Sequence, residues 1–101
     1  MMIVVAARIE STPEAIDAMR DAILTIQSAT MNEEGCEDYT FSIEMANQGA
    51  VRISERWASK EALAAHFATP HMAEFQAAMA ANPPKSVEAR FFDATEIEMP
   101  R

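Results

Sequence analysis

Both histidines of the chain lie in one short stretch, EALAAHFATPHM, at residues 61–72. An imidazole can serve as a general base, as a hydrogen-bonding group or as a metal ligand. His66 and His71 are five residues apart with Pro70 between them. Two metal ligands on one helix face need a spacing of three or four residues, so we expect no joint metal site. His66 is therefore interpreted as a base, and His71 as a residue that opens the next helix.

A carboxylate interrupts the apolar face of a predicted strand close to these histidines. Glu55 lies between Ile53 and Trp57 on the face that should point at the helices. A buried carboxylate is costly unless it is paired. His66 lies on the apolar side of the helix that follows, so we predict a Glu55–His66 hydrogen bond that would also fix the imidazole tautomer. Tyr39, one strand away, has the alternation that faces the same space.

His66, Glu55 and Tyr39 are therefore the predicted catalytic residues. The alternative is a polar network that serves only the fold, because buried polar groups mark function only some of the time. A metal site of two histidines completed by Glu55 or Glu74 is a further alternative, but no recognised metal motif supports it. Cys36 has no neighbouring base and is interpreted as a small apolar residue. A chain with two glycines cannot build a glycine-rich phosphate loop.

Length and charge exclude several classes of protein. The 101 residues predict a single domain over residues 1–101. The net charge of −8 argues against a nucleic-acid partner and against an anionic membrane surface. One cysteine allows no intrachain disulfide and favours the reducing cytoplasm. The apolar start MMIVVAA is too short to span a membrane, so we expect no membrane partner.

Hydrophobic periodicity and capping residues predict the elements that would position the site. Helices are expected after the capping residues Thr12, Ser59 and Thr69, with the first helix continuous until near Thr30. The predicted strands cover residues 3–9, 37–45, 50–57 and 86–97. The resulting order, β-α-β-β-α-α-β, is typical of an α+β fold with a ferredoxin-like antiparallel sheet and helices on one face.

The other face of such a sheet would be bare. Ile3 to Val5 are apolar at consecutive positions, so both faces of that strand need cover. A second copy of the chain could provide it, and we expect a homodimer.

The segments EEGCEDY at 33–39 and SERWASKEALAAHFATPHMAEF at 54–75 resemble the antibiotic biosynthesis monooxygenase (ABM) family, most closely its small quinol-monooxygenase members. The resemblance spans nearly the whole chain. It implies a dimeric α/β barrel built from ferredoxin-like subunits. It also implies oxidation of a small quinol or phenolic aromatic with O₂, without a metal or flavin cofactor.

The resemblance also implies which residues form the site. Positions that match the pocket of the family are Tyr39, Glu55, Trp57, His66 and His71, with Phe67, Met72 and Phe75 as walls, so that Trp57, Phe67, His71, Met72 and Phe75 would bind the substrate.

Some relatives have other residues at positions that carry their activity. Polyketide-oxidising relatives have an asparagine where this chain has Ile53. Haem-degrading relatives have an asparagine and a histidine where this chain has Ala6 or Ala7 and Gln76, which argues against haem degradation.

Three functions follow from these residues. The first is a cofactor-free monooxygenase in which His66 takes the phenolic proton and Tyr39 or His71 stabilises the developing oxyanion. The second is an isomerase or processing enzyme for a small signalling metabolite, with the same base and no need for oxygen. The third is a non-catalytic module that binds small molecules.

Overall fold

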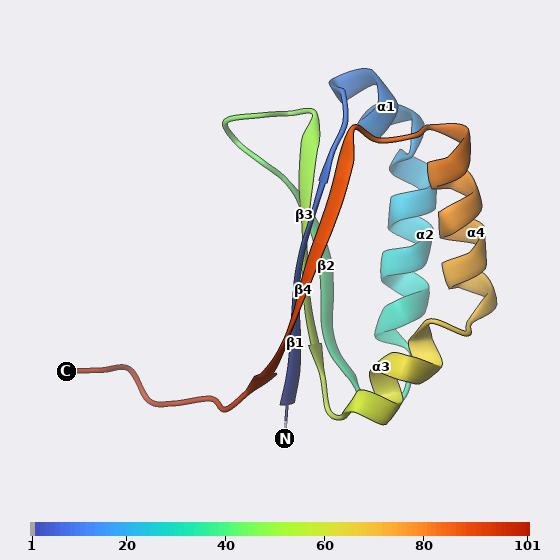
Figure 1. Ribbon diagram of the computed structural model, residues 1–101. Helices are drawn as coiled ribbons and strands as arrows, with labels where there is room; N and C mark the ends of the chain where they lie inside the picture. The colour runs from blue at the N-terminus through green and yellow to red at the C-terminus, as the bar shows by residue number, and fades with distance from the viewer. Residues whose placement is uncertain (1) are drawn as a thin grey trace.

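The computed structural model describes residues 2–101 and confirms the α+β class. Four strands form one antiparallel sheet in the order β2-β3-β1-β4, and the helices cover one of its faces (Figure 1). This is the predicted ferredoxin-like arrangement. The elements are β1 (Met2–Glu10), α1 (Pro13–Ala18), α2 (Arg20–Met31), β2 (Cys36–Ile43), β3 (Ala50–Trp57), α3 (Lys60–His66), α4 (Pro70–Ala81) and β4 (Ser86–Ala94).

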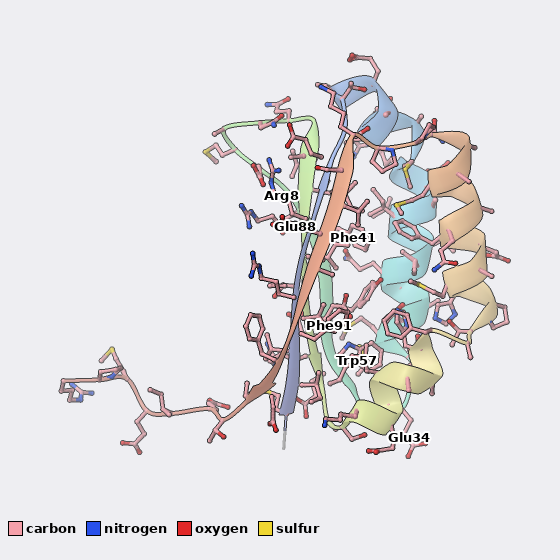
Figure 2. The ribbon with its side chains drawn as sticks, viewed as in Figure 1. Arg8, Glu34, Phe41, Trp57, Glu88 and Phe91 are labelled. Carbon is pink, nitrogen blue, oxygen red and sulfur yellow. The ribbon has the colours of Figure 1, made fainter. Side chains whose placement is uncertain are left out.

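The pairing of the two central strands sets which side chains enter the core. Val5 lies opposite Glu55 and Ile9 opposite Val51, and all four side chains are buried. Figure 2 shows Phe41 and Trp57 directed toward the helices, whereas Arg8 and Glu88 extend from the opposite side of the sheet, here called the open face. Alternation along each strand therefore places apolar side chains against the helices and leaves the open face, which carries Arg8 and Glu88, uncovered.

All three predicted helix caps are present. The side-chain oxygens of Thr12, Ser59 and Thr69 each accept a hydrogen bond from the backbone N–H three residues later, at 3.1, 3.1 and 3.3 Å respectively. Such caps satisfy N–H groups that have no partner within the helix. The caps at Ser59 and Thr69 fix where α3 and α4 begin, and so fix the positions of His66 and His71. Among residues 2–101, no helix is long and apolar enough to cross a membrane.

The prediction of one continuous helix from Thr12 to near Thr30 is wrong. The backbone at Met19 leaves the helical region, with φ −92° and ψ 1°, and separates α1 from α2. The N–H of Met19 is shared between the carbonyls of Ala15 and Ile16, which tightens the chain locally. No proline or glycine stands there, so the residue types carry no signal for this break.

Three predicted strands differ at their ends. The first covers Met2–Glu10 rather than residues 3–9. The last strand ends at Ala94 rather than Ile97. Ala94 pairs with Met2, the first residue of β1, so β1 offers no further partner within the described residues. Residues 95–101 then extend away from the sheet (Figure 1). The second strand covers Cys36–Ile43 rather than residues 37–45, and its pairing with β3 is irregular between Cys36 and Asp38. Despite this irregularity Tyr39 still lies opposite Glu55, on the side of the helices.

The turn between α2 and β2 depends on Gly35. Its φ of +82° is a conformation that residues with a Cβ rarely adopt. A Cβ placed there would lie 2.6 Å from the Cβ of Ala62 on α3. The carbonyl of Gly35 also accepts the N–H of Ala58 at 2.8 Å. Glycine therefore allows this turn to lie directly against α3.

Replacing Gly35 should cost stability for two separable reasons. Gly35→Ala is expected to lower the free energy of unfolding by at least about 1–2 kcal/mol from backbone strain, with an added cost from the clash with Ala62. In an Ala62→Gly background only the strain should remain, so the substitution should cost less there. Denaturant unfolding of the four proteins of this double-mutant cycle measures the difference. Equal costs in both backgrounds would contradict a tight contact between the turn and α3.

Candidate functional site

One carboxylate, Glu33, lies between the two histidines. Its Oε2 is 2.8 Å from Nδ1 of His66 and 2.6 Å from Nε2 of His71. Glu33 belongs to the turn after α2, His66 is the last residue of α3, and His71 is the second residue of α4. Three segments of the chain thus meet at a single oxygen atom. We call these three residues the Glu33 cluster.

The predicted Glu55–His66 hydrogen bond is wrong. Oε1 of Glu55 accepts the indole N–H of Trp57 at 2.9 Å, and the partner of His66 is Glu33. Alternation correctly placed Glu55 on the side of the helices, where it is 7% exposed. The indole of Trp57 lies two residues along the same strand face and satisfies this carboxylate locally, so Glu55 orients Trp57 rather than His66.

The two histidines lie close together, although Pro70 separates them in the sequence. The ring centroids of His66 and His71 are 6.0 Å apart. Periodicity along one helix does not apply here, because the chain turns between α3 and α4 and returns the second ring to the first. The turn itself is held by Thr69, whose hydroxyl donates to the carbonyl of His66 at 2.7 Å.

The hydrogen bonds of Glu33 define the tautomer of His66. A carboxylate oxygen can only accept, so both histidine nitrogens that face it must carry hydrogen. In the neutral ring of His66 the proton is then on Nδ1, and Nε2 keeps its lone pair. This is the form of imidazole that can take a proton from another molecule.

Aromatic rings surround the His66 imidazole. Its centroid lies 5.0 Å from Trp57, 5.3 Å from Tyr39 and 5.5 Å from Phe67. Of the eight predicted site residues, the structure gathers five in this group: Tyr39, Trp57, His66, Phe67 and His71. The others lie further out. Glu55 binds Trp57, Met72 packs on the core, and Phe75 packs edge-on against Phe41 at 5.6 Å.

Burial changes the acid–base properties of three groups near this site. Burial raises the pKa of Tyr39 above its usual value, so its hydroxyl keeps its proton and can donate. Burial also raises the pKa of Glu55, with hydrogen bonding from Trp57 and the nearby His66 opposing the change. The pKa of Cys36 rises to about 11, mainly because of burial, which fits the interpretation of this thiol as an unreactive apolar residue.

His66 is buried, and the aromatic residues predicted to bind substrate around it differ in exposure. Trp57 is fully buried and Phe75 is 5% exposed, so these two predicted walls are part of the packed core. Phe67 is 51% exposed and borders an apolar hollow of about 500 Å³ between α3 and β4. This hollow is lined by Ile3, Lys60, Leu63, Ala64, Phe67, Phe91, Phe92 and Asp93.

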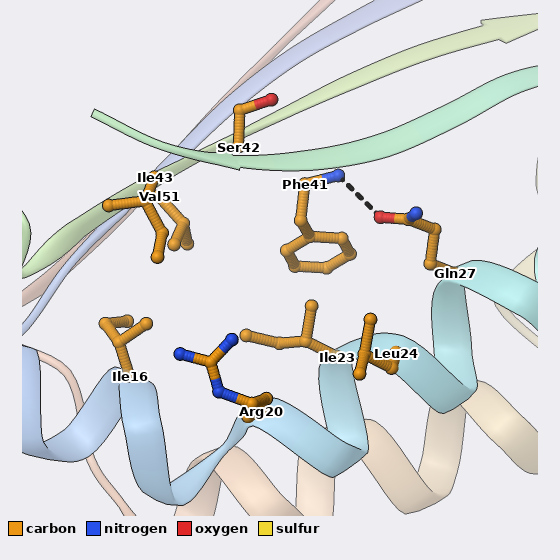
Figure 3. Close-up of a pocket in the computed structure, with 9 residues that line it drawn as sticks. All are labelled: Ile16, Arg20, Ile23, Leu24, Gln27, Phe41, Ser42, Ile43 and Val51. Carbon is orange, nitrogen blue, oxygen red and sulfur yellow. Dashed lines mark hydrogen bonds between the residues drawn. The ribbon is translucent and has the colours of Figure 1, made fainter. Parts of the chain in front are cut away.

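A second hollow lies between α1, α2 and the hairpin of β2 and β3 (Figure 3). Its volume of about 170 Å³ is below the ~300–1,000 Å³ of typical ligand pockets, and no predicted site residue lines it. Within it, Gln27 accepts the backbone N–H of Phe41 at 2.9 Å, drawn as a dashed line in Figure 3. This hollow is therefore separate from the Glu33 cluster.

Comparison with known proteins assigns the chain to a family. The profile of the family described as "Antibiotic biosynthesis monooxygenase" matches residues 2–78. The chain belongs to the ABM family. The predicted resemblance is thereby confirmed, and with it a general relation to monooxygenases.

Individual relatives of this ABM protein support the family assignment in sequence and in fold. The Mycobacterium tuberculosis protein named "Putative monooxygenase Rv0793" is 32% identical over 75 residues, which cover 74% of this chain and 73% of the relative. Its solved structure has a TM-score of 0.85 and covers 98% of this chain and 100% of that one. A Caulobacter crescentus structure described with the family name is 26% identical, with a TM-score of 0.86 and coverage of 94% and 91%. A Deinococcus radiodurans structure, 21% identical over 98% of both chains, shares the fold with a TM-score of 0.89.

Sequence reasoning missed Glu33. Residues 32–35, NEEG, are typical of a turn and by themselves predict nothing more. A signal was available, since two acidic residues precede Gly35 and two histidines elsewhere needed an acceptor. What the sequence of this ABM protein could not show is that the turn lies against α3, which places Glu33 inward while Glu34 stays exposed.

The buried carboxylate of Glu55 should make stability depend on pH. The pKa of Glu55 is raised in the folded protein, so ionisation of Glu55 opposes folding. The free energy of unfolding therefore falls as the pH rises above the pKa of Glu55 in the unfolded chain, and this fall levels off above the pKa in the folded protein. Glu55→Gln keeps an acceptor for Trp57 and lacks this loss. Relative to wild type, its free energy of unfolding should therefore rise between about pH 4 and about pH 8, as measured by urea unfolding.

The exposed Glu34→Gln serves as the control for this comparison. Its difference from wild type should stay nearly constant over the same pH range. A flat profile for Glu55→Gln would show that Glu55 has no raised pKa in the folded protein.

Proposed function

We propose that this ABM protein is a cofactor-independent monooxygenase that oxidises a small quinol or phenolic aromatic with O₂, with His66 as the general base. One observation carries the proposal. Glu33 accepts the Nδ1–H of His66, which leaves a lone pair on Nε2 of a ring that packs against Tyr39 and Trp57. Family membership supports the reaction class.

In the proposed reaction, Nε2 of His66 takes the phenolic proton, and Glu33 stabilises the resulting imidazolium. The phenolate is electron-rich and transfers electrons to O₂ directly. One oxygen atom bonds to a ring carbon, and the second leaves as water with the hydrogens of that C–H and of the O–H. The aromatic supplies all four electrons, so a phenol becomes a quinone and a quinol becomes a hydroxyquinone.

Tyr39 is proposed to stabilise the negative charge that develops on the substrate oxygen. Its ring lies 5.3 Å from that of His66, and burial keeps its hydroxyl protonated. A donor placed where charge develops lowers the barrier without reorganisation. His71 is the alternative donor.

The substrate is proposed to bind in the apolar hollow between α3 and β4. Phe67 contributes both to this hollow and to the rings around His66. Its side chain is half exposed and can move aside, whereas Trp57 is held by Glu55. Phe67 is thus the proposed wall between solvent and base, and Trp57, Met72 and Phe75 support the site from the core.

Oxygen uptake tests the reaction. Wild-type protein with a quinol such as menadiol should consume O₂ faster than buffer. His66→Ala should lower kcat by about 10²–10⁴-fold, the contribution of a positioned base. Tyr39→Phe keeps the ring and should lower kcat by about 10²-fold or more, the effect of losing one oxyanion donor.

Other outcomes identify other functions. Uptake by wild type that does not exceed buffer, or that is equal in His66→Ala, would overturn the monooxygenase mechanism. Substrate conversion that proceeds equally well under nitrogen would select the isomerase. Loss of stability in His66→Ala without turnover of any substrate would select a binding module in which the Glu33 cluster is structural.

We also propose that the protein is a homodimer that pairs through the open face. No element of the described chain covers this face (Figure 1). Phe92, opposite Val4 on that face, is 49% exposed, and the extended terminal segment carries Ile97 and Met99 at 73% and 68% exposure. Apolar groups exposed in this way are stabilised when a second copy covers them.

Light scattering during gel filtration tests the dimer. The untagged protein should have about twice the mass of the 11.1 kDa chain. Phe92→Glu should shift the mass toward one chain, because it places a charge in the interface. Leu24→Glu on α2, at a site of 57% exposure, should leave the mass unchanged. A monomeric wild type would contradict the proposal.

A further inference from the structure

We propose that the Glu33 cluster is a binding site for one divalent transition-metal ion, with Zn²⁺ as the preferred ion. The ligands would be Nδ1 of His66, Nε2 of His71 and a carboxylate oxygen of Glu33. The binding proposal rests on geometry and does not depend on the proposed oxidation.

The ligand atoms are close enough to share an ion. All three lie within 4.8 Å of one another. Zinc–nitrogen and zinc–oxygen bonds of about 2.0–2.2 Å place tetrahedral ligand atoms roughly 3.3 Å apart. The two histidine–Glu33 distances, 2.8 and 2.6 Å, are shorter than this. To admit the ion, Glu33 would move outward by less than about 1 Å, and the two ring nitrogens, which lie within 4.8 Å of one another, would come to lie about 3.3 Å apart.

The ring hydrogens of the two histidines do not prevent metal binding. In the ion-free site, the hydrogens on Nδ1 of His66 and Nε2 of His71 occupy the space between the ligands. Each neutral imidazole can carry its hydrogen on the other ring nitrogen, so both rings change tautomer and expose lone pairs. No proton needs to leave the rings. Two neutral imidazoles and one carboxylate give the set a charge of −1, which complements a divalent cation.

The ligand types select the metal. Two imidazoles and one carboxylate suit Zn²⁺, Ni²⁺, Cu²⁺ or Fe²⁺, whereas Mg²⁺ and Ca²⁺ prefer oxygen ligands. Three protein ligands leave one tetrahedral position for water. Cu²⁺ binds such ligands most strongly, but Zn²⁺ has no geometric preference of its own and accommodates a tetrahedral set best.

A path to the site exists. His71 borders a hollow between α2 and α4 that is also lined by Asp21, Thr25 and Glu74. The side chain of His71 is 19% exposed, whereas that of His66 is 2% exposed. Two carboxylates at the entrance attract a cation from solution. The ion would therefore meet His71 first and reach His66 and Glu33 behind it.

Occupancy would inhibit the proposed oxidation. With the metal on Nδ1 of His66, the ring hydrogen is on Nε2, which then donates and cannot take a phenolic proton. This consequence, unlike binding itself, rests on the proposed function.

Metal binding is tested on untagged, chelator-treated protein without substrate. Calorimetry should show one Zn²⁺ per chain, and Co²⁺ should give the visible absorption of a tetrahedral complex. ¹⁵N-histidine NMR should show Zn²⁺ on Nδ1 of His66 and Nε2 of His71. His71→Gln and Glu33→Gln should each weaken binding by at least about tenfold. Glu34→Gln, one residue from the cluster and exposed, should bind as wild type does.

The outcomes separate the two proposals. Absence of Zn²⁺ binding, or equal binding by wild type and His71→Gln, would overturn the metal site. If Glu33→Gln does not fold, His71→Gln decides, because His71 lies at the edge of the core. Binding at the cluster with unchanged oxygen uptake would keep the metal site and overturn the role of His66 as base. Inhibition of the wild type by Zn²⁺ that a chelator reverses would support both.

Discussion

The geometry of this ABM protein around its histidines depends on one oxygen atom. Oε2 of Glu33 accepts hydrogen bonds from rings at the end of α3 and the beginning of α4, while its own backbone closes α2. Charge-assisted hydrogen bonds of this kind are among the stronger ones in proteins, and low dielectric strengthens them further. The same contact therefore holds the helices together and sets which ring nitrogen of neutral His66 carries its hydrogen. Stability and chemistry cannot be adjusted independently at this position.

Local contacts at three other residues hold the segments that bring Glu33 and the histidines together. Gly35 lets the turn approach Ala62, Thr69 closes the chain between the histidines, and Glu55 holds the indole of Trp57 beneath the imidazole. None of these groups contacts both histidines. Each restricts a movement of the backbone or of a side chain that would let the two rings separate. A small, marginally stable domain can thereby keep polar groups in a defined arrangement in its interior.

Much of the fold could be predicted from the sequence because its signals are local. Caps at Ser59 and Thr69 and the alternation of Val51, Ile53 and Trp57 act over three or four residues, and the structure contains them as predicted. The break at Met19 was not predictable from residue types. The partner of His66 was not predictable either, since Glu33 lies thirty-three residues away in a turn, whereas Glu55 lies on the strand face expected to point at the helices. Periodicity places a side chain on a face of a strand or helix, but it does not place a carboxylate that belongs to a turn.

The hydrogen bond from the backbone of Phe41 to Gln27 has a consequence for self-association. β2 and β4 are the two edges of the sheet, and α2 reaches over the β2 edge to occupy one of its free N–H groups. A fibre that grows by strand addition needs two receptive edges on every copy, whereas a closed pair needs only one. Blocking one edge in mid-strand thus disfavours fibres that grow by strand addition, and it does not obstruct pairing through the open face.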